Sequence, residues 1–207
     1  MKITKALLLT IALTSVVTAQ SQIRITEFAH GGTYDEYVEL TNIGGSAIDL
    51  AGWSYDDDSA IPGVFDLSGL GVVNAGESVL FVEEADVEVF RTGWNLSAAV
   101  KIVGGVTNNL GSGDTINIFD ATSTLIDSLS YTGSVSGTSR NGSLAVLGTN
   151  NNSAWEASFV GDLYGSYNAV GSTNVGNPGQ YSPVPEPATM TVLAVAALAA
   201  AAKRRRK

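Results

Sequence analysis

Short runs in which apolar and polar residues alternate repeat along the chain from residue 23 to residue 131. In the sequence YVELTN, Val38 and Leu40 fall on one face of an extended strand, and Tyr37 and Glu39 fall on the other. Glycine, asparagine, aspartate and serine separate the runs, as is typical of turns. Seven or eight short strands at this spacing predict an all-β fold, an antiparallel β-sandwich with Trp53 in its core. The other runs are residues 23–28, 47–55, 64–70, 77–83, 98–104, 114–120 and 124–131.

One segment departs from this alternation. Residues 84–92 place Val87 and Phe90 three positions apart, so both side chains share a face if the segment is helical. We therefore expect a short crossover helix there. Residues 133–152 are rich in Gly, Ser and Asn, a composition that on its own is typical of a linker.

The charge of the chain is unevenly distributed. The formal net charge is −9, but between residues 20 and 187 only four basic residues stand against all 20 acidic residues, which gives this region −16. Such a surface repels phosphate backbones, so we expect no nucleic-acid partner. The chain has no cysteine and one histidine, so disulfides, thiolate metal sites and cysteine nucleophiles are excluded.

The first twenty residues have the pattern of a secretory signal peptide. Lys2 and Lys5 precede an apolar stretch at residues 6–17, and small residues end it at Ala19. Cleavage after Ala19 is the prediction, and an uncleaved anchor or a buried helix is the alternative. The absence of cysteine means only that the exported domain must be held together by its core.

The C-terminus combines a conformationally rigid Pro-Glu-Pro segment, which we call the stiff step, with an apolar stretch and a basic end. Residues 188–202 carry no charge and would form a helix of about 22 Å, short of the ~30 Å hydrocarbon layer of a membrane. Basic residues stay on the cytoplasmic side, so this end resists translocation. The basic end is Lys203, Arg204, Arg205, Arg206 and Lys207, and the stiff step is Pro185, Glu186 and Pro187.

These three parts, in this order, resemble the PEP-CTERM sorting signal of Gram-negative bacteria. The resemblance implies transient insertion in the inner membrane and processing near Pro-Glu-Pro by an exosortase, a membrane cysteine protease. The alternatives are an ordinary tail anchor and a helix packed on the domain. A helix that is apolar all round and ends in KRRRK fits packing on a domain badly.

The central part resembles the lamin-tail domain, an immunoglobulin-like sandwich. The resemblance implies a fold more than an activity, because its motifs are mostly turns and core positions. It also extends the domain to about residue 180, past the linker-like stretch. The residues that carry it are Ile25-Thr26-Glu27, Glu36-Tyr37-Val38-Glu39-Leu40-Thr41-Asn42, Ile48-Asp49-Leu50-Ala51-Gly52-Trp53, Ala75-Gly76-Glu77, Leu110-Gly111-Ser112-Gly113-Asp114, Asp127, Tyr131, Ser139-Arg140, Trp155 and Asn177-Pro178-Gly179.

Candidate metal ligands are few. Asp56, Asp57 and Asp58 are weak calcium candidates, since calcium prefers carboxylate oxygens. Successive residues of an extended chain point to opposite faces, so a single ion would meet two of them at most. A solvated acidic turn is therefore the interpretation. For Asp114 the predicted role is hydrogen bonding within a turn.

Catalytic and ligand-binding candidates are equally scarce. His30 precedes two glycines, but no G-x-S-x-G nucleophile motif accompanies it, so we interpret it as a loop residue. Tyr164, Tyr167 and Tyr181 suit either a carbohydrate-stacking surface or side packing, and packing is favoured because a buried tyrosine ring removes much apolar area from water.

The sequence thus predicts three parts: a signal peptide at 1–19, a lamin-tail-like domain at 20–182 and a sorting signal with a short transmembrane helix at 183–207. The leading hypothesis is a non-enzymatic protein without a cofactor, with a structural or binding role in the cell envelope, on the cell surface or in the extracellular matrix. Its candidate partners are an exosortase-type enzyme and exopolysaccharide or other envelope components. The alternatives are a permanently anchored binding module and a secreted hydrolase. The hydrolase would need two facing carboxylates ~5–10 Å apart in a cleft.

Overall fold

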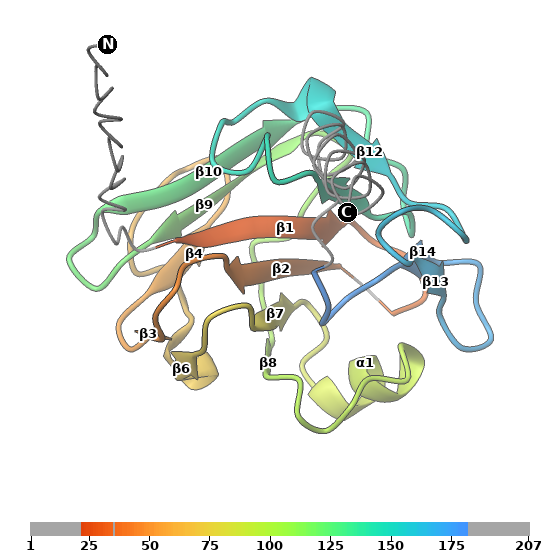
Figure 1. The fold of residues 1–207 in the computed structure, drawn as a ribbon, viewed down its shortest axis with the longest axis horizontal. Helices are drawn as coiled ribbons and strands as arrows, with labels where there is room; N and C mark the ends of the chain where they lie inside the picture. Colours follow the sequence, from red (N-terminus) through yellow and green to blue (C-terminus); the bar gives the residue numbers. More distant parts are fainter. Residues whose placement is uncertain (1–21, 35, 182–207) are drawn as a thin grey trace, which may run out of the picture.

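Residues 22–34 and 36–181 are described by the computed structural model, in which two main sheets face each other (Figure 1). The first sheet has six strands in the order β12 (Trp155–Ala157), β11 (Arg140–Gly142), β1 (Ile23–Ala29), β2 (Tyr37–Asn42), β7 (Ser78–Val82) and β8 (Ile102–Gly104). The second sheet has four, in the order β10 (Leu125–Tyr131), β9 (Asp114–Phe119), β4 (Ser54–Asp56) and β5 (Phe65–Asp66). The all-β, immunoglobulin-like sandwich predicted from the sequence is confirmed.

Smaller elements connect and cover these sheets. Two short antiparallel pairs join β3 (Ile48–Asp49) to β6 (Val72–Val73) and β13 (Tyr167–Asn168) to β14 (Val175–Gly176). The helix α1 spans Val87–Gly93, and 3₁₀ turns occupy Ser68–Leu70 and Asn152–Ala154. The expected helix therefore exists but begins later than residue 84, because Asp86 caps it by accepting a hydrogen bond from the Glu88 backbone N–H at 3.1 Å.

Two details of the strand prediction were wrong. The described residues form fourteen strands, not seven or eight, because residues 47–55 divide into β3 and β4, β6 lies between two runs, and strands β11 to β14 follow the last alternating run. The sheets are also not wholly antiparallel, since β7 and β8 pair in parallel. A parallel pair needs a crossover connection, and the segment with α1 supplies it.

The main core lies between the two sheets. Trp53 is 6% exposed there, as expected, beside Ile23, Ile25 and Leu40 from the first sheet and Ile116 and Ile118 from the second. Alternation along β1 and β2 sends these apolar side chains to one side. The residues of the inner face are therefore those that the alternating pattern indicated.

The first sheet is buried on its other face as well. We call this face, turned away from the second sheet, the outer face. Tyr37, Leu80 and Val82 point to it and pack against Phe90 of α1 and Trp94. All six residues of β2 and all five of β7 are consequently buried.

Candidate functional site

Two glutamates lie opposite each other on the outer face of the first sheet. Glu27 of β1 and Glu39 of β2 are register partners, and both side chains are 0% exposed. The register of β1 and β2 shifts between Ile25 and Glu27, which marks a bulge at Thr26. A bulge sets two residues against one, so Thr26 and Glu27 both reach the outer face, while the apolar residues on either side keep to the core.

Neutral donors surround the two carboxyl groups. The Ser139 hydroxyl donates to Glu27 Oε1 at 2.5 Å, and the Asn177 backbone N–H donates to the same oxygen at 2.8 Å. The Thr26 hydroxyl donates to Glu39 Oε1 at 2.6 Å. Oε2 of each glutamate is buried without a hydrogen-bond partner among the described residues. Neither glutamate takes part in the ion pairs of the described chain, which join Glu88 to Arg91 and Glu77 to Lys101.

Burial without a cation favours the protonated forms. Burial raises the pKa of Glu27 from 4.5 to about 7, and the hydrogen bonds from Ser139 and Asn177 only partly offset it. Burial, followed by the charge of Glu27, raises the pKa of Glu39 to about 8. Burial also raises the pKa of the neighbouring Tyr37 well above its ordinary value. The pair therefore holds at least one proton at neutral pH, and its two titrations are coupled.

The last described segment covers this pair. A Cβ built on Gly176 of β14 would overlap Tyr37 Oη and lie 2.9 Å from Glu27 Oε1 and from Ser139 Oγ. No side chain fits between β14 and the carboxyl groups, so only glycine can occupy this position. The pair is sealed beneath protein, whereas a glycosidase needs its two carboxylates in a cleft open to substrate.

The aspartate triplet is arranged differently from the solvated turn expected from the sequence. Asp56 is 0% exposed, and its Oδ2 accepts hydrogen bonds from the Ile61 backbone N–H and the Ser59 hydroxyl, each at 2.6 Å. The Asn108 amide donates to Asp56 Oδ1 at 2.6 Å. The solvated interpretation was therefore wrong for Asp56, because the 57–61 loop folds back to supply donors.

The electrostatics of Asp56 follow from these contacts. Desolvation alone would raise its pKa, but the hydrogen bonds from Ile61, Ser59 and other donors hold the pKa below its usual value. Asp57 is half-buried and Asp58 is exposed. Within residues 22–34 and 36–181, no three His, Asp or Glu side chains are placed to hold a metal ion.

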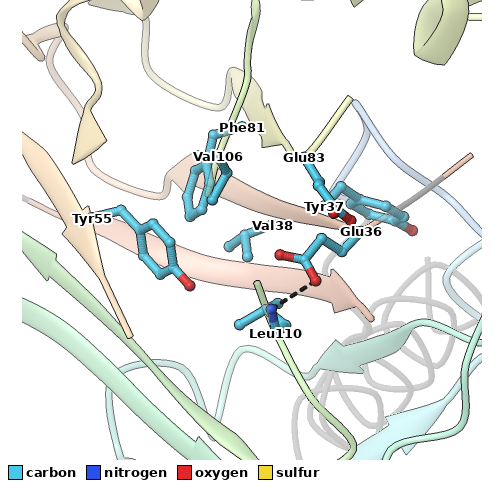
Figure 2. Close-up of a pocket in the computed structure, with 8 residues that line it drawn as sticks. All are labelled: Glu36, Tyr37, Val38, Tyr55, Phe81, Glu83, Val106 and Leu110. Atoms are coloured by element: carbon cyan, nitrogen blue, oxygen red, sulfur yellow. Dashed lines mark hydrogen bonds between the residues drawn. The ribbon is translucent and has the colours of Figure 1, made fainter. Parts of the chain in front are cut away.

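A small cavity lies between the sheets at the start of β2. Figure 2 shows the side chains that line it, among them Glu36, Tyr55, Phe81 and Leu110. The Leu110 backbone N–H donates to Glu36 Oε2 at 2.7 Å across it. Its volume of about 10 Å³ is room for a single water molecule, so it is not a ligand site.

A larger cavity opens at the surface beside the end of the described chain. Its volume is about 320 Å³, within the range of small-ligand sites. We call it the Tyr167 cavity. None of the residues that line it carries a charge, and several offer amide, hydroxyl or aromatic groups. The lining residues are Asn95, Leu96, Ser97, Val100, Tyr164, Gly165, Tyr167, Asn177, Pro178, Gly179 and Gln180.

The tyrosines singled out from the sequence mainly pack. Tyr164 is 3% exposed, Tyr167 packs edge-on against Trp94, and the Tyr167 hydroxyl donates to the Trp94 carbonyl at 2.9 Å. Tyr181 packs partly buried against the main core. The packing interpretation is confirmed, although two of the three also line the Tyr167 cavity. These tyrosines therefore shape the walls of the cavity.

Two further predictions concern single residues. Asp114 accepts hydrogen bonds from the Gly111 and Thr115 backbone N–H groups at 2.9 and 2.8 Å, which confirms its role in the turn. His30 is half-buried at the end of β1, and burial, with a smaller contribution from Arg140, lowers its pKa.

The residues of the two expected targeting signals lie outside the described residues. These are the cleavage residue Ala19, the step Pro185, Glu186 and Pro187, and the basic end Lys203, Arg204, Arg205, Arg206 and Lys207. Among the residues that the structure describes, no helix has the length and apolar character that crossing a membrane requires.

Sequence reasoning did not identify the Glu27–Glu39 pair. Both residues stand in the motifs quoted above, but their meeting depends on the strand register and on the bulge at Thr26. A hairpin pairing of residues 23–28 with 37–42 would have placed the two glutamates near each other. Nothing in the sequence indicated that the outer face is buried.

Comparison with known families matches two regions of the chain. The Lamin Tail Domain family matches residues 17–133, and the PEP-CTERM protein-sorting motif matches residues 183–207. No curated protein and no solved structure shows a significant match to the chain.

Proposed function

Since the chain belongs to the Lamin Tail Domain family and ends in a PEP-CTERM sorting motif, we propose that it is an exosortase-processed protein with a binding role in the cell envelope or its extracellular matrix. The sorting motif indicates export in a Gram-negative bacterium, and the family domain indicates a non-catalytic structural unit. The binding role and the final location are the parts we propose.

The observation that carries the proposal is the position of the sorting motif relative to the sandwich. Tyr181 is still tied into the domain, because its backbone N–H donates to Ser78 Oγ at 3.1 Å and its hydroxyl donates to the Gly142 carbonyl at 3.2 Å. Pro185 follows four residues later. Processing near Pro-Glu-Pro would therefore release the whole sandwich without cutting into it.

The same logic sets the proposed boundaries at the other end. The first strand begins at Ile23, and the proposed signal peptide ends at Ala19. Removal of residues 1–19 and of the segment after Pro-Glu-Pro leaves a domain of about 20–182. Both removed segments carry the basic residues that favour the cytoplasm, and the acidic remainder suits export.

For the binding role we propose the Tyr167 cavity and a neutral saccharide as its ligand. The absence of charge in its lining argues against phosphate, carboxylate or amine ligands, which need a charged partner when desolvated. Aromatic and amide groups match the apolar faces and hydroxyl groups of a sugar ring. Exopolysaccharide of the matrix is a source of such rings.

The hydrolase alternative is not favoured by the geometry. Glu27 and Glu39 are two facing carboxyl groups, but both are 0% exposed, and β14 lies directly against Glu27. A general acid must reach the proton acceptor within hydrogen-bonding distance. A substrate at the surface could not come within that distance of this pair, because both side chains are fully buried.

Processing is tested by intact-mass measurement of the protein recovered from a host that has the cognate exosortase. The expected mature protein ends near Pro-Glu-Pro, and replacement of Pro185, Glu186 and Pro187 with alanine should leave full-length precursor in the inner membrane. Replacement of the five terminal basic residues with serine should instead yield missorted, unprocessed protein. Wild-type protein that retains Lys207 would contradict the sorting and support a permanent anchor.

The binding role is tested by calorimetric titration of the processed protein with neutral oligosaccharides from the host matrix. Ser97→Trp places an indole in the exposed mouth of the Tyr167 cavity and should abolish binding. Thr107→Trp alters an exposed residue outside the cavity and should leave saccharide binding unchanged. Equal affinities for the two variants and the wild type would refute the cavity as the site.

A further inference from the structure

Three large apolar side chains are exposed together on one turn after β12. We call residues 158–165 the apolar turn. Phe159, Val160 and Leu163 are 64%, 60% and 76% exposed, and all three lie within five consecutive residues. Single exposed apolar residues are common on protein surfaces, but a cluster of this kind marks a contact surface.

The conformation of the apolar turn is fixed by its own hydrogen bonds. Asp162 accepts from the backbone N–H groups of Tyr164 and Ser166, both at 3.0 Å, and from that of Phe159 at 3.2 Å. The Tyr164 side chain is 3% exposed and anchors the turn to the domain. The apolar side chains are thus held outward by a rigid support, so their exposure is built into the fold.

The apolar turn lies at the same edge of the sandwich as the end of the described chain. The Tyr181 hydroxyl donates to the carbonyl of Gly142, and Gly142 is the register partner of Trp155 in β12. The Ser166 hydroxyl, next to the turn, donates to Asn177 Oδ1 at 3.2 Å. Strand β12 is the edge strand of the first sheet (Figure 1), and the apolar turn follows it directly.

The length of chain beyond Tyr181 limits how far this edge can lie from a membrane. Six residues, 182–187, separate Tyr181 from the apolar stretch that begins at Ala188. Fully extended, they span about 20 Å. While residues 188–202 are held in the bilayer, Tyr181 stays within that distance of its surface, and the edge to which Tyr181 is bonded is kept close to the membrane.

We propose that the apolar turn docks on the outer surface of the inner membrane and inserts Phe159, Val160 and Leu163 among the lipids while the tail is held there. This inference rests on the proposed sorting function. Residues 155–181 contain no lysine or arginine and include Glu156 and Asp162, so attraction to anionic headgroups does not drive the contact. Apolar insertion does, and zwitterionic lipid suffices.

Docking orients the precursor for processing. With the tail and the apolar turn as two contacts at one edge, the domain cannot rotate freely about the tail. The step at Pro185 is then presented at the membrane surface in a fixed orientation. Once the tail is removed, only these three side chains hold the domain to the membrane. Binding to the membrane then becomes reversible, and the domain can leave.

The test uses the absence of cysteine in the chain, which makes a single introduced cysteine the only labelling site. Leu163→Cys carries an environment-sensitive fluorophore on the apolar turn. Leu125→Cys is the matched control, because Leu125 is 51% exposed at the start of β10, in the second sheet, whereas β12 belongs to the first. Both full-length variants are reconstituted into phosphatidylcholine vesicles that carry a headgroup nitroxide quencher, at less than one protein per vesicle.

Quenching at position 163 several-fold stronger than at position 125, with a blue-shifted emission, is the expected result. Equal quenching in chains that float with the vesicles overturns the docking and leaves the sorting proposal intact. Chains that do not float overturn the anchoring and the docking together. Blue-shifted emission at position 163 in detergent that depends on protein concentration identifies a contact between copies of the chain, and this also overturns the docking.

A second measurement links the contact to processing. The variant with Phe159, Val160 and Leu163 replaced by serine should be processed several-fold more slowly in the exosortase host. Replacement of Ile61, Val64 and Leu125 by serine serves as the control, because it removes as many exposed apolar side chains elsewhere on the domain. Ile61 and Val64, 54% and 46% exposed, lie between β4 and β5, and Leu125, 51% exposed, begins β10. Equal rates for the two triple variants contradict a role in presentation.

Discussion

Raising the pH should weaken this domain across the neutral range, because Glu27 and Glu39 must lose protons inside the fold. Both side chains are 0% exposed and have neutral donors as their hydrogen-bond partners. In the unfolded chain the two carboxyl groups ionise near the ordinary value of 4.5, whereas in the folded chain their pKa values are about 7 and about 8. The folded state therefore holds protons that the unfolded state has already released.

The direction in which stability changes with pH follows from this difference in bound protons. Below pH 4.5 both states are protonated at the two glutamates, and their contribution to stability is complete. Between pH 4.5 and about 8 the folded state binds more protons, so the free energy of unfolding falls as pH rises. Above about pH 8 both states are ionised and the loss is complete.

The size of the loss follows from the pKa shifts. Each pKa unit corresponds to about 1.4 kcal/mol, so the shift of Glu27 corresponds to about 3 kcal/mol and that of Glu39 to about 5 kcal/mol. Because the two titrations are coupled, the loss of free energy is a property of the pair and cannot be divided between the two glutamates. A typical domain has only about 5–15 kcal/mol in total, so a loss of several kcal/mol would be plainly measurable.

The assay is denaturant unfolding of residues 20–182 at constant ionic strength between about pH 5 and pH 8.5, the window that the two shifts define. Glu39→Gln replaces the carboxyl group with a neutral isostere and should flatten the decline. Glu156→Gln alters an exposed glutamate of β12 and should leave the profile of the wild type. Because His30 has a lowered pKa, which acts in the opposite direction, the difference between Glu39→Gln and the wild type is the decisive quantity. Stability that stays constant or rises over this range in the wild type would refute the reasoning.

Four further perturbations test other parts of the fold. Trp53→Ala should lower the free energy of unfolding by about 3–5 kcal/mol in denaturant titrations, since the indole is 6% exposed in the core, and a loss below about 1 kcal/mol would contradict this. Gly176→Ala should destabilise by several-fold more than Gly45→Ala in thermal melts, because the added methyl meets Tyr37 and Glu27 in the first case and nothing within 4 Å in the second. Calcium chelators should leave the melting temperature unchanged, whereas Asp56→Ala should lower stability by about 1–3 kcal/mol by removing the acceptor of several hydrogen bonds. A chelator-sensitive melt would instead indicate a site worth about 2.7 kcal/mol at a hundredfold excess of calcium over its dissociation constant.

The alternating pattern was sufficient to predict the inner face of the sandwich. Val38, Leu40 and Trp53 were placed in the core because alternation assigns a face without knowledge of strand order. In β1 the alternation holds for Ile23 and Ile25 but breaks after Ile25, where the bulge at Thr26 shifts the register. Propensity does not reveal such a bulge, since the added residue is an ordinary threonine of a strand-like run.

The burial of the part of the outer face that carries the two glutamates could not be predicted, because the segment that covers it is polar in composition. Residues 164–181 are rich in Gly, Ser and Asn, which in isolation suggests a loop. In the structure this composition is what the buried carboxyl groups require: Asn177 supplies a backbone donor to Glu27, and Gly176 leaves room for the contact. A segment that covers a buried polar cluster must itself be small and polar, so hydrophobicity cannot identify it.

The position of this cover connects folding to sorting. The segment that covers the buried pair continues within a few residues into the region that matches the sorting motif. Ionisation of the pair would loosen this segment first, because the two charges would lie directly beneath it. It would therefore weaken the domain on the side that leads into the sorting motif.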